Sequence, residues 1–116
     1  MIENKNYSAP PKSTELFGAE TYLTSPITGG VYSSPFLAEG YVNYGHTEDK
    51  LIQITFVRGG VDMGRIEEHS YHATFSFPHS QAPGPYSAWW AIYWRGKWYP
   101  QTDTGVGWFY VKTPPE

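Results

Sequence analysis

Apolar and polar residues alternate along several short runs of the chain, a pattern typical of strands that bury one face. The clearest run, at residues 71–77, alternates between an apolar set (Tyr71, Ala73, Phe75, Phe77) and a polar set (His72, Thr74, Ser76). Successive side chains of a strand point to opposite sides of the sheet. We therefore expect Phe75 to lie in a core and Thr74 to face solvent.

Runs of this kind recur about every 8 to 14 residues with Gly and Pro between them, a spacing typical of a β-sandwich or barrel. We predict strands near residues 17–24, 36–44, 50–58, 61–66, 71–77, 87–94, 97–100 and 106–112. The pairs Gly59-Gly60 and Arg95-Gly96 predict tight hairpin turns, because Gly adopts the positive φ that such turns need. The proline-rich segment 78–85 is predicted to be the longest loop.

Composition favours an all-β domain. The 116 residues suffice for one core. The chain has 12 Gly and 10 Pro, which disfavour helix interiors. We expect a flexible N-terminal tail at residues 1–14, a single β-sandwich domain at 15–112 and a C-terminal tail at 113–116. The absence of Cys excludes thiol nucleophiles, zinc–thiolate sites and iron–sulfur clusters.

Charge and hydropathy exclude two classes of partner. Eight basic residues against eleven acidic ones leave a net charge of −3, and the basic residues are dispersed along the chain. We therefore expect no nucleic-acid partner, which would require a basic patch. No apolar run approaches the ~18 residues of a membrane span, and the first residues lack the apolar segment of a signal peptide. We expect no membrane span.

Residues 25–45 carry a recognisable pattern: Pro26, a Gly pair, Val31, a Ser-Pro step at Pro35, and Glu39-Gly40 followed by Val42. This pattern resembles the region around the first two strands of bacterial immunoglobulin-like domains, which occur in surface adhesins and multidomain secreted hydrolases. The resemblance implies an immunoglobulin-like antiparallel β-sandwich and an extracellular or cell-surface location. It also fits the physics of the segment, since two prolines would bracket an edge strand that changes sheets and Gly40 would permit close backbone approach.

A second segment, residues 88–94, is apolar on both faces and contains three of the five tryptophans. If Trp90, Ile92 and Trp94 face the core, the period of two turns Trp89 and Tyr93 outward. The same reasoning for the last strand places Phe109 and Val111 inside and Trp108 and Tyr110 outside. These two strands are neighbours in an immunoglobulin-like sheet. We therefore predict an aromatic face made of Trp89, Tyr93, Trp108 and Tyr110, with Gln53 and Thr55 beside it and Trp98 and Tyr99 near its edge.

Three interpretations of the aromatic face remain open from the sequence. Sugar rings stack on indoles while their hydroxyls bond to Gln, Asn, Asp and Tyr, so the face could bind carbohydrate through Trp89, Tyr93, Trp108, Tyr110, Trp98 and Gln53. Large apolar patches also mark protein interfaces, which would make the chain a structural or interaction domain in a surface, phage or toxin assembly, or a homodimer. Alternatively, the tail or a loop covers the rings.

Other chemistry has little support in the sequence. Glu67-Glu68-His69-x-x-His72 holds metal-ligand types, but His69 and His72 would point to opposite faces of a strand. Acidic residues in predicted loops do not follow the spacing of a dedicated calcium loop. There is no nucleophile elbow and no glycine-rich phosphate loop. We expect a non-catalytic module with no cofactor and no metal.

Overall fold

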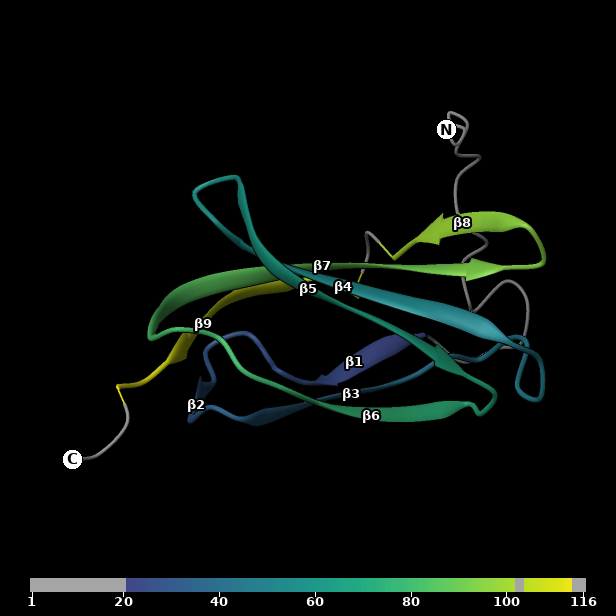
Figure 1. Cartoon of the computed structure of the whole chain (residues 1–116), viewed down its shortest axis with the longest axis horizontal. Coiled ribbons are helices and arrows are strands. Elements are labelled where there is room, and N and C mark those ends of the chain that lie inside the picture. Colours follow the sequence, from purple (N-terminus) through teal and green to yellow (C-terminus); the bar gives the residue numbers. More distant parts are fainter. Residues whose placement is uncertain (1–20, 102–103, 114–116) are drawn as a thin grey trace.

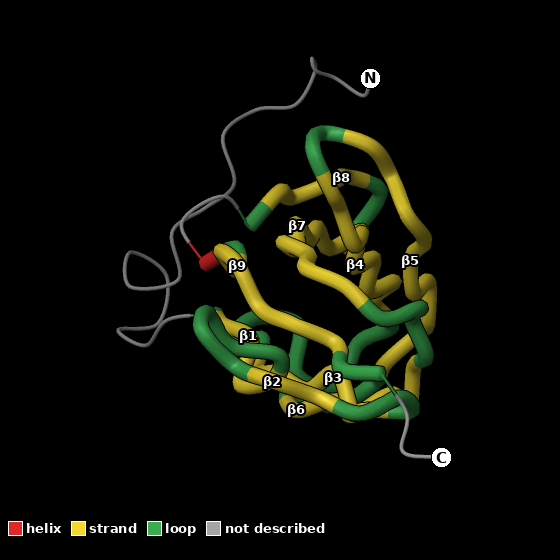
Figure 2. Tube along the Cα trace, turned by 90° about the vertical axis from the view of Figure 1, so that its left-hand side faces the viewer, coloured by secondary structure: helices red, strands yellow, loops and turns green. Residues whose placement is uncertain are grey.

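The computed structural model describes residues 21–101 and 104–113, which form nine strands in two sheets packed face to face. Figure 1 labels the strands, and Figure 2 shows the two layers, with β4, β7 and β8 in one and β1, β3 and β6 in the other. The predicted all-β sandwich is confirmed. The tails predicted at residues 1–14 and 113–116 lie outside the described residues, apart from Thr113.

The smaller sheet has three strands in the order β1-β3-β6: β1 (Tyr22–Ser25), β3 (Phe36–Tyr41) and β6 (Thr74–His79). The larger sheet follows the order β2-β9-β7-β4-β5: β2 (Val31–Tyr32), β9 (Val106–Val111), β7 (Gly84–Trp94), β4 (Lys50–Arg58) and β5 (Val61–Ser70). The remaining strand, β8 (Lys97–Pro100), pairs with the end of β7. The adjacency of β4, β7 and β9 opposite β3 and β6 is the strand order of an immunoglobulin-like sandwich.

The segment between β1 and β3 changes sheets as the prolines predicted. β1 pairs antiparallel with β3, whereas β2 runs parallel to β9 in the other sheet. Pro26 and Pro35, both after cis peptide bonds, stand on either side of β2. The close approach expected at Gly40 is also present, because a Cβ there would lie 2.6 Å from the Phe75 ring and 2.7 Å from the Tyr22 carbonyl oxygen.

Aromatic rings join the two sheets across the core. The ring of Phe36 in β3 lies edge-on to Phe56 of β4, with 5.9 Å between centroids, and 6.2 Å from Phe109 of β9. Phe75 of β6 meets Trp90 of β7 at 5.8 Å. All five side chains are at least nine-tenths buried, so the inward positions of five strands form one continuous core.

Both predicted hairpin turns are present, and in each the two central residues have positive φ: 58° and 80° at Gly59 and Gly60, and 52° and 78° at Arg95 and Gly96. The limits of several other predicted strands needed correction. The strand predicted at 71–77 begins at Thr74, so Tyr71 lies in the preceding turn and is 58% exposed, although Phe75 is buried as predicted.

The segment 78–85 is not one long loop. β6 continues through Pro78 to His79 and β7 begins at Gly84, which leaves only residues 80–83 between them. Proline is tolerated because β6 is an edge strand of its sheet and Pro85 lies at the start of β7.

Candidate ligand-binding face

The aromatic side chains of strand β7 alternate between the inner and the outer face of the large sheet. Trp90 and Ile92 point into the core with 4% and 0% of their surface exposed, whereas Trp89 and Tyr93 are 60% and 40% exposed on the outer side of the large sheet. β7 is paired on both edges, by β4 on one side and by β8 and β9 on the other. The exposed rings on β7 therefore stand on a central strand of the sheet that is paired along both edges.

Strand β9 adds the other half of the aromatic face. Phe109 and Val111 are buried, and Trp108 and Tyr110 are 60% and 44% exposed on the same side as Trp89. Between the pairs Tyr86–Phe109 and Ala88–Val106, β9 has two residues, Gly107 and Trp108, where β7 has only Ser87. This β-bulge, a local change that can re-aim a side chain, sets Trp108 beside Ser87 and thus diagonally across from Trp89.

Strand β8 brings Trp98 to the aromatic face. Its register pairs Trp98 with Tyr93, and the two rings lie 5.2 Å apart at 59°. Trp98 is half-buried as a result. Tyr99 instead pairs with Ile92 and lies on the inner side of the sheet, with its ring 5.9 Å from the ring of Tyr44. The prediction that Tyr99 lies near the edge of the aromatic face is therefore wrong. Successive residues of a strand alternate, and only one of the two can face outward.

A groove of about 390 Å³ lies beside Trp89. It opens where β8 leaves the edge of β7 and β9 has not yet begun to pair. Its described lining comes from strands β4, β7 and β8 and from the connection between β8 and β9: Gln53, Thr55, Trp89, Trp90, Ala91, Pro100, Gln101 and Gly105. Ala91 faces outward yet is only 8% exposed. We refer to this hollow as the Trp89 groove.

Polar groups border the Trp89 groove. On the adjacent strands, Gln53 Nε2 donates to Glu67 Oε2 at 2.6 Å, and Thr55 is half-exposed next to Trp89. On the other side, Gln101 Nε2 donates to Tyr44 Oη and to the Tyr99 carbonyl oxygen, both at 2.8 Å. The groove thus combines an aromatic wall with amide and hydroxyl groups, and hydrogen bonds already orient both amides.

We compared the chain with known families, proteins and structures. No protein-family model, curated protein or solved structure matches it. The resemblance of residues 25–45 to bacterial immunoglobulin-like domains therefore stays a prediction, and the site is interpreted from its own geometry.

The structure brings all six predicted ligand-binding residues to one face. Trp89, Tyr93, Trp108 and Tyr110 are exposed there, and Trp98 and Gln53 are half-buried beside them. Sequence reasoning did not find Pro100, Gln101, Gly105 or Glu67 as part of this surface. For Pro100 the signal was available, because the period of two from Trp98 points it the same way.

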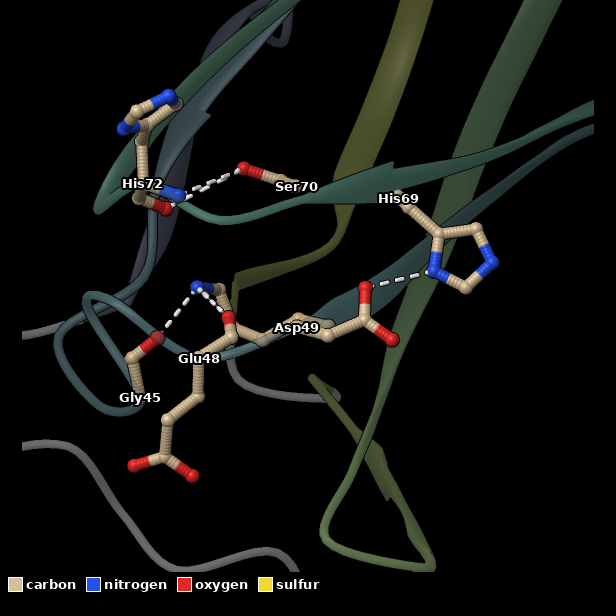
Figure 3. A network of polar contacts seen from close by, with 7 residues as sticks. Gly45, Glu48, Asp49, His69, Ser70 and His72 are labelled. Carbon is tan, nitrogen blue, oxygen red and sulfur yellow. Dashed lines mark hydrogen bonds and ion pairs between the residues drawn. The ribbon is translucent and has the colours of Figure 1, made fainter.

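At one end of the sandwich, loop 45–49 is held by charged side chains (Figure 3). Lys50 points inward with no exposed surface, and its Nζ donates to the carbonyl oxygens of Gly45 at 2.5 Å and Glu48 at 3.2 Å. Burial lowers the pKa of Lys50. The Glu48 carboxylate accepts two hydrogen bonds from Arg95 and one from Trp94 Nε1, and the bond from Arg95 is the main reason that its pKa is lowered. These contacts serve to fasten the loop to the β7–β8 turn.

The two histidines of the Glu67–His72 segment do not converge. His69 Nδ1 lies 2.7 Å from Asp49 Oδ1, whereas His72, on the far side of Ser70 in Figure 3, contacts the Ser70 hydroxyl through its backbone. Within residues 21–101 and 104–113, no group of three or more His, Asp or Glu side chains is placed to hold a metal ion. The same part of the chain contains no helix long and apolar enough to cross a membrane.

Proposed function

We propose that the chain is a non-catalytic binding module whose ligand is carbohydrate or a cell-surface glycoconjugate. The observation that carries this proposal is the aromatic face with the Trp89 groove at its centre. Four large rings stand exposed on one face of a sheet whose opposite side is the core, and such exposure is costly unless a ligand or partner uses it.

The chemistry of the groove favours a sugar over a purely apolar ligand. A pyranose ring has an apolar C–H face that stacks on an indole, and a rim of hydroxyls that needs both donors and acceptors. Trp89 supplies the indole, and Gln53 and Thr55 supply polar atoms within the same hollow, with Gln53 held by its hydrogen bond to Glu67. The groove volume also lies in the usual range of small-ligand sites, about 300 to 1,000 Å³.

Binding of the full chain to an immobilised glycan array tests the proposal. Trp89→Ala should abolish the signal of any glycan that the unmodified chain retains, because it removes the stacking surface. The matched control is Tyr71→Ala, which removes an aromatic ring of similar exposure from the turn after β5, away from the aromatic face. Binding that survives Trp89→Ala, or that is lost equally in the control, would contradict the proposal.

A second candidate function is a protein interface, including a homodimer through the same face. It is favoured by Val31, which is 61% exposed and lies beside Tyr110 at the edge of the sheet, where it extends the aromatic face with an aliphatic side chain that has nothing to offer a sugar hydroxyl. Light scattering coupled to size-exclusion chromatography separates the two functions. A dimer that binds no glycan supports the interface, and a monomer that binds glycan supports the module.

The place of action is part of the same proposal. The likeness of residues 25–45 to domains of bacterial surface adhesins and secreted hydrolases suggests a role at a cell surface or in the extracellular medium, where glycans are accessible. This inference rests on the resemblance alone, and localisation of the native gene product in its source cell would test it.

A further inference from the structure

We propose that the aromatic face binds an extended, neutral oligosaccharide chain and not a single terminal sugar or an acidic glycan. The inference rests on the proposed function and adds the ligand class. Two observations carry it: the distance over which the exposed rings are spread, and the charge of the groups around them.

The rings form a row that is too long for one sugar. Trp108 lies beside Ser87, Trp89 stands one alternation further along β7, and Tyr93 packed on Trp98 stands two alternations beyond that. The six steps from Ser87 to Tyr93 span roughly 20 Å at about 3.3 Å per residue. A monosaccharide seated in the Trp89 groove would leave the outer rings unused, whereas a chain of several sugars would reach all of them.

The Trp89 groove lies along this row, because its lining includes Trp89 and residues of the strand segments on either side of it. Its neighbours at the two ends belong to different strands, with Pro100 at the end of β8 and Gly105 just before β9. Gly105 has no side chain, so this residue itself adds no wall between the groove and Trp108 of β9. This geometry favours a ligand that passes through the groove over one that ends in it.

The charges around the face favour a neutral ligand. Among the residues that the structure describes, all those that line the Trp89 groove are uncharged. On the flanking strand β5, Arg65 is paired with Asp62 and lies 3.7 Å from Glu67, and His69 contacts Asp49. An arginine that already faces two carboxylates is a poor partner for a sulfate, phosphate or uronate, and the chain as a whole carries a net charge of −3.

Calorimetric titration of the full chain tests both parts of the proposal, the length of the oligosaccharide and its lack of charge. The probes are neutral disaccharides and hexasaccharides of glucose, mannose and galactose, together with the hexasaccharide of galacturonic acid. For the best neutral series, we expect the hexasaccharide to bind at least about tenfold more tightly than the disaccharide, which corresponds to one further ring contributing about 1.4 kcal/mol. The galacturonic acid chain should bind at least about tenfold more weakly than the best neutral hexasaccharide.

Substitutions locate the effect. Tyr93→Ala and Trp108→Ala should each reduce affinity for the hexasaccharide more than affinity for the disaccharide, because these rings flank the groove. Trp89→Ala should reduce both, and Tyr71→Ala neither. Circular dichroism of each variant confirms that it is folded before it is titrated.

Each outcome decides something. A disaccharide that binds as tightly as the hexasaccharide overturns the extended chain, and a galacturonic acid chain that binds as tightly as the neutral one overturns the neutral ligand. In both cases the proposed function stands. If no probe binds and the glycan array is also negative, the proposed function fails and this inference fails with it.

Discussion

Trp89 and Trp90 are neighbours in the chain and carry the same side chain on opposite faces of the sheet. Replacing each with alanine therefore compares how much a tryptophan contributes to stability on the outer and on the inner face. A fully buried Trp removes about 200 Å² from water. Trp90 is 4% exposed, and at about 25 cal/mol per Å² its burial contributes about 5 kcal/mol, within the range of about 3 to 5 kcal/mol for large-to-small core substitutions. Its Nε1 also donates to Thr104, with the carbonyl and hydroxyl oxygens both at 3.2 Å.

The same calculation for Trp89, which is 60% exposed, gives about 80 Å² and no more than about 2 kcal/mol. Trp90→Ala should therefore lower the free energy of unfolding by about 3 kcal/mol more than Trp89→Ala does. In a domain whose total stability is about 5 to 15 kcal/mol, this difference separates a folded variant from a marginal one.

Urea unfolding, followed by far-ultraviolet circular dichroism, measures both values without relying on tryptophan fluorescence. Each variant is measured at two protein concentrations, because a second copy covering Trp89 would make the stability depend on concentration. A cost for Trp89→Ala equal to or greater than that for Trp90→Ala would refute the assignment of sides in β7 and, with it, the aromatic face.

Three further predictions address the rest of the fold. In urea unfolding, Phe75→Ala should lower the free energy of unfolding by about 3 to 5 kcal/mol, and Thr74→Ala, on the exposed side of β6, by no more than about 0.5 kcal/mol. Similar values for the two variants would show that both faces of β6 are covered. Burial raises the pKa of Tyr44 well above its ordinary value of 10, so above that pH the folded state keeps a proton that the unfolded state loses. The stability of the fold should therefore fall as the pH rises above about 10. Thermal unfolding measured as a function of pH should show a smaller fall in Tyr44→Phe, which has no hydroxyl to titrate. Gly40→Ala should cost about 1 to 3 kcal/mol because its Cβ would overlap the Phe75 ring, whereas Gly105→Ala, whose Cβ would meet its nearest atom at 3.4 Å, should be tolerated in the same melting assay.

Much of the fold follows from local patterns in the sequence. The strands at residues 50–58 and 97–100 were predicted with the limits that the structure shows, because each is bounded by a clear turn signal. Tyr71 shows where this reasoning fails. It continues the alternation of residues 71–77, but the pairing of β6 with β3 starts only at Thr74, opposite Tyr41, so Tyr71 lies outside the paired strand and stays 58% exposed.

The candidate site likewise has features that the sequence predicts and features that it does not. The sequence determined which side of its strand each of Trp89, Tyr93, Trp108 and Tyr110 occupies, because the period of two is a property of the extended backbone and needs no knowledge of neighbours.

The Trp89 groove and its polar border were decided only by the tertiary structure. The bulge between Phe56 and Val57 shifts the β4–β5 register by one residue, so Gln53 meets Glu67; uninterrupted pairing from the turn would set it opposite Ile66. Whether an extra residue is accommodated in a strand depends on which pairing buries the apolar side chains of both strands at once. The choice of register depends on residues that are far apart in the chain, and so does the grouping of Gln53, Trp89 and Gln101 around one groove. A local sequence pattern therefore cannot predict either of them.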